Sequence, residues 1–329
     1  MTSSPPKLRV YFLGAGEIAV PILQKLASLD SIELIGAGTQ IDRPAGRKRK
    51  LAPTPVGAAG DAAGIPVERI NNVNAPDFLA TLREKKPDMI LVVSFGQLLR
   101  NDLLTLPRLG CVNVHASILP RYRGASPIVN AILNQDSETG ITYMAMDKGL
   151  DTGAIYHIVK HPLSGTETSE SLEHDLGNIG AAHLEDALLG IASGRYQPVP
   201  QPLTTYANTR KIHKQDGFLD WRHSARELEA KIRAYHPWPG TQALLAWPDD
   251  RTLLIGIRSA KIHENHKGSP GEILRADKHG IIVCCGSGAL ELLEIAPPGR
   301  KVMSSSAFLN GCPVKGAAFL NENPFAAVK

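Results

Sequence analysis

The chain has 329 residues, of which 43% are hydrophobic and 21% are charged, and its formal net charge is +4. This composition is typical of a soluble globular protein with one large or two ordinary domains. It excludes a membrane-spanning protein, because no apolar run approaches the roughly 20 residues that cross a bilayer. The first residues lack the apolar core of a signal peptide, so the expected compartment is the cytoplasm.

The first two thirds of the chain alternate between strand-like and helix-like runs. Apolar runs predict strands at 8–13, 32–37, 65–67, 89–93 and 111–115, with helices at about 17–29 and 74–86, the second capped by Asn74. Further along, we expect a helix at 127–133, strands at 140–146 and 154–159, and one long helix at about 169–193. The fold class is therefore α/β, with a doubly wound, mainly parallel sheet.

The last third has a different pattern. Residues 195–202 contain three prolines and indicate a stiff linker. A helix at 224–234, capped by Ser224, precedes short strand-like runs at 242–247, 252–260, 271–276, 280–285 and 289–295. About five short strands at this spacing predict a small β-barrel of the oligonucleotide-binding type. The predicted domains are thus 1–194, a linker at 195–208, and a barrel domain at 209–329.

The positive charge is concentrated in two places. Residues 205–329 hold 17 Lys and Arg against 12 Asp and Glu, or +5, whereas the rest of the chain holds 19 against 20, or −1. Within that rest, five cations lie in the eight residues 43–50. Two basic regions would suit a polyanion gripped at two points. A solvated loop and an ordinary basic domain remain an equal alternative.

A polar pair stands at the end of the predicted strand 111–115. Residues two apart on a strand point to one face, so Asn113 and His115 point one way while Val112 and Val114 point the other. Ligands of open α/β sheets bind beyond the carboxyl ends of the strands. Acyl transfer to an amine needs donors for an oxyanion and a proton acceptor. Asn113 and His115 can donate, and Asp151, 36 residues after His115, could accept or relay a proton. The alternative for Asp151 is a turn residue bonded to its own backbone.

No nucleophile accompanies this set. Ser117 and Ser126 lack the G-x-S-x-G turn, and Cys111 lies in an apolar run. Direct transfer without an acyl-enzyme is the simpler hypothesis, and we expect no metal. The thiols have no metal-ligand spacing and are expected to be buried and reduced. They are Cys111, Cys284, Cys285 and Cys312.

The first strand is followed by Gly14-Ala15-Gly16-Glu17-Ile18-Ala19, which matches the G-x-G-x-x-A pattern of dinucleotide-binding folds. A single match is weak evidence. The second strand of such a fold usually ends in an acidic residue that binds the ribose, and Thr39-Gln40 stand there instead. Binding of NAD(P) is therefore not expected.

The segment from Asn113 to Ile128, together with Gly149 to Gly153, resembles the signature of the folate-dependent formyltransferases. Segments at 39–40, 42–47, 53–56, 220–221, 232–234 and 237–239 resemble the members that act on initiator tRNA. The resemblance covers nearly the whole chain in order. The first turn departs from it, because the family usually has Gly-Thr-Pro there, and this leaves the role of the turn open. The resemblance implies formyl transfer from 10-formyltetrahydrofolate to methionyl initiator tRNA, for translation initiation, by a cytoplasmic enzyme.

The resemblance also assigns roles to residues of this chain. Asn113, His115 and Asp151 would be catalytic. The folate would contact Ser117, Ile118, Leu119, Pro120, Phe95 and Gly96. The tRNA would contact Arg43, Arg47, Lys48, Arg49, Lys50, Arg210, Lys211 and Lys214, with Arg47 matching the most critical arginine of the family. Neither a membrane nor an obligate protein partner is implied.

Two other functions remain as alternatives. A formyltransferase acting on a small amine, such as an amino sugar nucleotide or glycinamide ribonucleotide, would share the catalytic residues but would not need the basic loop or the barrel. A nucleic-acid-binding protein with a vestigial catalytic fold would need neither Asn113 nor His115 nor Asp151, and all three are present.

Overall fold

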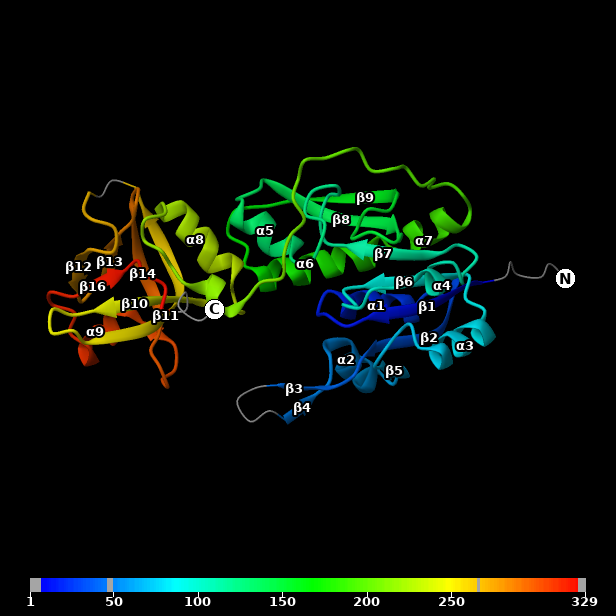
Figure 1. Cartoon of the computed structure of the whole chain (residues 1–329), viewed down its shortest axis with the longest axis horizontal. Coiled ribbons are helices and arrows are strands. Elements are labelled where there is room, and N and C mark those ends of the chain that lie inside the picture. Colours follow the sequence, from blue (N-terminus) through cyan, green and yellow to red (C-terminus); the bar gives the residue numbers. More distant parts are fainter. Residues whose placement is uncertain (1–6, 46–49, 265–266, 325–329) are drawn as a thin grey trace. The chain divides into compact units, whose positions relative to one another are not determined.

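The computed structural model describes residues 7–45, 50–264 and 267–324 (Figure 1). It separates into two compact units. The first comprises Met1–Pro127, Glu138–Pro162 and Leu172–Thr209, and the second comprises Ile128–Ser137, Leu163–Ser171 and Arg210–Lys329. Two short segments of the N-terminal part of the sequence thus group with the C-terminal residues. Across the described residues, no helix is both long enough and apolar enough to cross a membrane.

The first unit is built on a seven-stranded sheet with the strand order β5-β2-β1-β6-β7-β8-β9. The strands from β5 to β7 are parallel, and β8 is antiparallel to both of its neighbours, β7 and β9. This confirms the predicted doubly wound, mainly parallel sheet. The strands are β1 (Leu8–Gly14), β2 (Ile32–Gln40), β5 (Val67–Ile70), β6 (Met89–Val93), β7 (Cys111–His115), β8 (Glu138–Ala145) and β9 (Ile155–Pro162).

Helices cover both faces of this sheet, which is why the central strand β6 is apolar throughout. On one face, residues of α3 (Pro76–Lys85) and α4 (Asn101–Leu104) share a buried cluster with Tyr11, Ile90 and Cys111. On the other face lie α1 (Ala19–Ala27) and α7 (Leu184–Ala192), together with α6 (Ser169–Ala182), whose Gly180 lies close to Ile22 and Val114. Helix α2 (Pro55–Ala63) packs against β5 and α1.

Two predicted helix details are wrong. Ala75, not Asn74, is the N-cap of α3, because the Asn74 side chain is engaged elsewhere. Its Nδ2 donates to the Leu98 carbonyl at 2.8 Å, and its Oδ1 accepts from the Arg100 amide at 2.8 Å. The single helix expected at 169–193 is two helices, because the backbone at His183 leaves the helical region with φ −95° and ψ 1°.

The second unit contains an antiparallel sheet with the order β12-β13-β14-β11-β10-β16. A bridge between Glu272 and Ala318 joins its two ends, so the sheet curls into a barrel-like form, as predicted. The closing strand β16 was not predicted, because it has only three residues. The elements are β10 (Thr241–Ala246), β11 (Thr252–His263), β12 (Ile273–Asp277), β13 (Gly280–Cys284), β14 (Ala289–Ala296), β15 (Met303–Ser304), β16 (Ala318–Leu320), α5 (Pro127–Leu133), α8 (Ala225–Ala234) and α9 (Ser305–Gly311).

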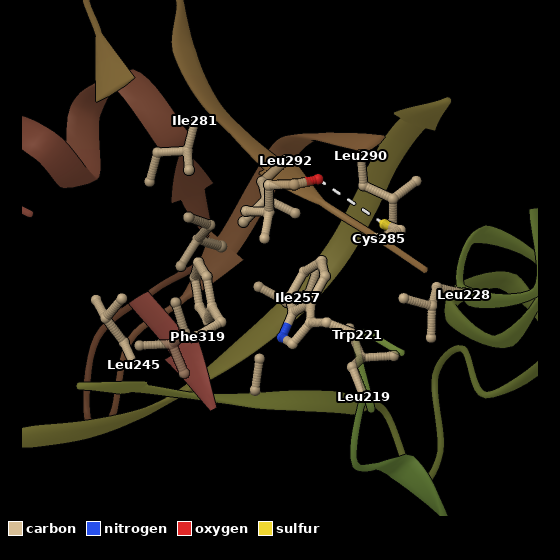
Figure 2. Close-up of a cluster of buried hydrophobic side chains, with 14 of the residues drawn as sticks. Leu219, Trp221, Leu228, Leu245, Ile257, Ile281, Cys285, Leu290, Leu292 and Phe319 are labelled. Carbon is tan, nitrogen blue, oxygen red and sulfur yellow. Dashed lines mark hydrogen bonds between the residues drawn. The ribbon is translucent and has the colours of Figure 1, made fainter. Parts of the chain in front are cut away.

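Trp221 lies at the centre of the core of this unit (Figure 2). Its ring lies 5.0 Å from that of Phe319, between the strands and helix α8. Cys285 belongs to the same cluster and Cys111 to the core of the first unit, and burial raises the pKa of each thiol to about 12. All four cysteines are free, and the burial expected of them holds for all except the partly exposed Cys312.

Helix α8 begins with a reciprocal cap. Ser224 Oγ accepts from the Glu227 amide at 3.2 Å, and Glu227 Oε2 accepts from the Ser224 amide at 2.8 Å. We expect Ser224→Ala to lower the free energy of unfolding by about 1 kcal/mol, measured with denaturant at pH 7.

This loss should shrink in acid. The hydrogen bonds from Ser224 hold the pKa of Glu227 below its usual range. A lowered folded-state pKa stabilises the fold above the unfolded-state value of about 4.3, and this contribution disappears as the pH falls further. A difference between wild type and Ser224→Ala that stays constant from pH 7 to pH 3 would contradict the role given to Glu227.

Candidate active site

The candidate site begins at the carboxyl end of β7. Cys111 on this strand packs into the cluster beneath α3 and α4, whereas Val112 and Val114 are buried on the opposite face. Asn113 and His115 share the direction of Cys111, because side chains alternate along a strand. Both side chains reach Asp151, which confirms their predicted common face. His115 is only 6% exposed, so its ring is held by the protein rather than by water.

The loop between β8 and β9 brings Asp151 to this pair. Asn113 Nδ2 donates to Asp151 Oδ1 at 3.4 Å, and His115 Nδ1 lies 3.7 Å from Asp151 Oδ2. The structure thus brings together all three residues expected to be catalytic. Asp151 has φ 54°, in the left-handed region that a non-glycine residue seldom adopts. Such a conformation persists only where the surroundings impose it, and it is typical of functional sites.

The His115 ring is flanked by an acceptor on each side. Its Nε2 lies 3.0 Å from the Tyr122 carbonyl oxygen, which can only accept, so Nε2 carries a hydrogen. Its Nδ1 faces the Asp151 carboxylate. The imidazole is therefore oriented by two contacts. When it is protonated, both of its nitrogens can donate.

The turn after β7, inside the signature segment, completes the support of Asp151. The Gly124 amide donates to Asp151 Oδ2 at 2.8 Å. Gly124 has φ +105°, and a side chain on it would overlap the Thr209 carbonyl oxygen. Only glycine fits this position, because both the backbone angle and the close approach of another segment exclude a Cβ atom. Tyr122, Gly124 and Thr209 were not singled out from the sequence.

Residues 117–120 form the loop expected to contact the folate. Ser117 is buried, its Oγ donates to the Arg121 carbonyl at 2.7 Å, and its own carbonyl accepts from Thr142 Oγ at 2.6 Å. Leu119 is buried and donates its amide to the same Thr142 oxygen at 3.2 Å. The Ser117 and Leu119 side chains therefore shape the loop. Ile118 and Pro120 are half-buried.

The loop after β6 holds Phe95 and Gly96. The Phe95 ring is 2% exposed and belongs to the core, while its carbonyl accepts from Gln40 Nε2 at 2.5 Å. Gly96 is exposed and has φ +76°. Any contact of Phe95 with a ligand would thus be made by its backbone rather than by its ring.

A carboxylate lies at the N-terminus of α1, the helix that follows the turn at 14–16. The amide of Ile18, at the start of α1, donates to Glu173 Oε1 at 3.3 Å. In a dinucleotide-binding fold this helix terminus holds a pyrophosphate. A carboxylate at that place disfavours an anion, in line with the expectation that NAD(P) does not bind.

The basic loop is carried on a two-stranded ribbon of β3 (Arg43–Ala45) and β4 (Lys50–Ala52), which extends away from the end of β2 (Figure 1). Arg43 and Lys50 are both exposed, and Leu51 beside them is 72% exposed. Arg47, Lys48 and Arg49 lie outside the described residues.

Three expected tRNA contacts lie in the second unit. Arg210 makes two hydrogen bonds of 2.7 Å to the Asp216 carboxylate, and these raise its pKa and lower that of Asp216. Its charge is thus largely balanced within the protein. Lys211 and Lys214 are exposed.

Metal-ligand geometry is not found among the described residues, where no group of three His, Cys, Asp or Glu side chains could hold an ion. His157 and His161 have the four-residue spacing of helical zinc ligands, but they lie on strand β9. On a strand this spacing separates the two residues by about 13 Å, too far for one ion.

Family models cover both parts of the chain. "Formyl transferase" matches residues 8–188, and "Formyl transferase, C-terminal domain" matches residues 211–313. Among curated proteins, the methionyl-tRNA formyltransferase of Geobacter metallireducens is 41% identical over 309 residues, covering 93% of this chain and 96% of the relative. That of Pseudomonas entomophila is 40% identical over 304 residues, covering 92% and 96%.

Solved structures share the fold at lower identity. HypX from Aquifex aeolicus in complex with tetrahydrofolic acid matches with a TM-score of 0.61 at 16% identity, covering 92% of this chain and 47% of HypX. An N-formyltransferase from Helicobacter canadensis, in complex with folinic acid and dTDP-3-aminofucose, matches with a TM-score of 0.61 at 16% identity, covering 87% and 99%.

Proposed function

The chain belongs to the formyl transferase family, and from this premise we propose that it transfers the formyl group of 10-formyltetrahydrofolate to the amino group of methionyl initiator tRNA. The observation that carries this proposal is the meeting of Asn113, His115 and Asp151 in a chain about 40% identical to methionyl-tRNA formyltransferases over nearly its whole length.

In the proposed reaction the amino nitrogen of the methionine attacks the formyl carbon directly. A C–N bond forms, and the carbonyl oxygen gains negative charge in the tetrahedral intermediate. Asn113 Nδ2 stabilises that oxygen by donating a hydrogen bond, and a protonated His115 stabilises it by placing a positive charge beside it. The bond from the formyl carbon to the folate nitrogen then breaks. One proton leaves the attacking nitrogen and one reaches the departing nitrogen, so the transfer is balanced.

Asp151 serves this reaction in two ways. Its carboxylate faces His115 Nδ1 and stabilises the charged ring during the reaction. It also accepts or relays the proton lost by the attacking amine. The Gly124 amide keeps one of its oxygens in place at 2.8 Å. No covalent enzyme intermediate is needed, and no metal step is invoked.

The formyl acceptor, a tRNA, is a polyanion, and we propose that two basic regions of this chain bind it. The loop around residues 43–50 contacts the acceptor end, and the C-terminal barrel, with Lys211 and Lys214, holds the body of the tRNA. These contacts address phosphates, so binding should weaken steeply with salt. Translation starts in the cytoplasm, where we place the enzyme.

A comparison of acceptors tests this function. The purified chain is incubated with 10-formyltetrahydrofolate and one of three acceptors: initiator methionyl-tRNA, elongator methionyl-tRNA or a free amino sugar nucleotide. Formylation should be fastest on the initiator tRNA. Faster transfer to the amino sugar nucleotide would replace the proposal with sugar formylation, and transfer to none of the three would overturn it.

Arg47 provides a sharper test of the acceptor. We expect Arg47→Ala to lower kcat/KM for initiator methionyl-tRNA by roughly 10- to 100-fold and to reduce the slope of log kcat/KM against log salt by about 1. The KM for the folate should stay unchanged, because the loop addresses phosphates of the tRNA.

The matched control is Arg83→Ala, which removes an exposed charge from the last turn of α3, a turn that leads into the opposite end of the sheet from the site. Arg83→Ala should leave kcat/KM for the tRNA and KM for the folate near their wild-type values. If Arg47→Ala impairs kcat/KM for the tRNA and KM for the folate equally, or changes neither, Arg47 is not the tRNA contact assigned to it.

A further inference from the structure

The segment that follows the last helix of the first unit passes directly beside the candidate site. Val199 exchanges two backbone hydrogen bonds of 2.8 Å with Ile155. Ten residues later, the Thr209 amide donates to the Arg123 carbonyl at 2.7 Å, and the Ala125 amide donates to the Thr209 carbonyl at 3.1 Å. Residues 199–209 are therefore fastened to the start of β9 at one end and to the turn after β7 at the other, although the sequence predicted only a linker there.

Gln201 lies between these two anchors and joins two active-site segments. Its Nε2 donates to the carbonyls of Asp151 and Gly153, both at 2.8 Å. Its Oε1 accepts from Arg123 Nε at 2.9 Å and from Arg123 Nη2 at 2.7 Å. The side-chain amide has two hydrogens and two lone pairs, and all four are used. Such a complete set of bonds leaves the side chain one geometry.

We propose that Gln201 is a positioning residue that holds the Asp151 loop in its active conformation against the Arg123–Gly124 turn. It touches neither Asn113 nor His115, so it acts through Asp151 and is not itself catalytic. The inference rests on the proposed function, because it concerns the same carboxylate.

The physical reason lies in the backbone of Asp151. Its φ of 54° lies in the left-handed region, which aspartate adopts more readily than most residues but still at a cost, so contacts that oppose relaxation help to keep this conformation. Two contacts oppose relaxation. The Gly124 amide holds the carboxylate, and Gln201 holds the backbone carbonyl of the same residue. Both come from parts of the chain distant in sequence from Asp151, so the loop is held from outside.

Two substitutions distinguish the bonds that Gln201 donates to the Asp151 loop from those that it accepts from Arg123. Gln201→Met keeps the length of the side chain and removes all four hydrogen bonds. Gln201→Glu keeps an acceptor for Arg123 but sets a carboxylate oxygen against the two carbonyls. We expect each to lower kcat by roughly 10- to 100-fold, with KM for the folate within about threefold of wild type, because a small misplacement of a reacting group affects turnover more than binding.

Gln197→Met is the matched control. Gln197 belongs to the same proline-bearing segment, and its Nε2 donates to the Gly194 carbonyl at 2.7 Å, away from Asp151. It should keep the wild-type kcat. Thermal unfolding is measured for every variant. Gln201→Glu retains the Arg123 contact, so it carries the test if Gln201→Met does not fold.

The decisive measurement is a double-mutant cycle with Asp151→Asn, in single turnovers with excess enzyme. If Gln201 acts through Asp151, Gln201→Met should slow the Asp151→Asn variant by less than about threefold, because interacting residues are not additive. A full 10- to 100-fold loss in both backgrounds would show a general structural role and overturn the inference, as would normal turnover of Gln201→Glu.

The activity of the wild-type enzyme distinguishes failure of the proposed function from failure of the role given to Gln201. Absence of formyl transfer by the wild type contradicts the proposed function itself. Formyl transfer by the wild type combined with normal turnover of Gln201→Glu contradicts only the role of Gln201.

Discussion

Asp151→Asn is expected to lower turnover by roughly 10²- to 10⁴-fold, and His115→Ala should fall in the same range. The substitution keeps the size of the side chain but removes the negative charge that faces His115 Nδ1 at 3.7 Å. An amide also cannot take the proton lost by the attacking amine. The KM values for folate and tRNA should change little, because the lost interaction is made mainly in the transition state. Single-turnover rates with saturating tRNA measure the effect.

Asp147→Asn is the control for this prediction. Asp147 lies in the same loop, where its carboxylate accepts from the Gly149 amide and the Thr152 hydroxyl at 2.8–2.9 Å. It does not face His115, so its variant should retain most of the turnover. Near-normal turnover of Asp151→Asn, with the fold intact, would remove Asp151 from the mechanism.

Asn113→Ala is expected to lower kcat by roughly 10²- to 10³-fold, which is typical for the loss of one oxyanion donor. The amide of Asn113 needs no ionisation to donate, so the loss should be nearly constant between pH 6 and pH 9. The ratio of the Asn113→Ala rate to the wild-type rate across that range checks this expectation.

Asn101→Ala is a suitable comparison, because Asn101 is an exposed asparagine at the start of α4. It should retain wild-type kinetics. A loss in Asn113→Ala that appears only in KM, with kcat unchanged, would show that Asn113 binds the substrate equally in ground state and transition state, and would exclude an oxyanion role.

Much of the fold could be predicted from the sequence because its signals are local. The apolar run 89–93 is buried at every position, as expected for the centre of a sheet covered on both faces. The Ser224 cap of α8 is equally local, because Ser224 and Glu227 stand three residues apart and satisfy each other. The period of two along a strand is enough to place Asn113 and His115 on one face.

The wrong predictions have different physical causes, and one of them is competition from distant groups. Asn74 has a good capping side chain, but the 98–100 loop uses both of its polar atoms. The helix at 169–193 breaks at His183, a residue that carries no helix-breaking signal in the sequence. The strand β16 is too short to recognise by its own pattern, and pairing with β10 defines it.

The sequence by itself determined the sheet, the barrel and the strand-end pair Asn113 and His115, because these depend on periodicity and on neighbours close in the chain. Only the tertiary structure decided that Asp151 meets this pair, and that Gly124 and Gln201 hold it there. Those contacts join residues 27 to 50 positions apart. No local pattern encodes them, because they arise when the β8–β9 loop, the turn after β7 and the 199–209 segment converge at one edge of the sheet.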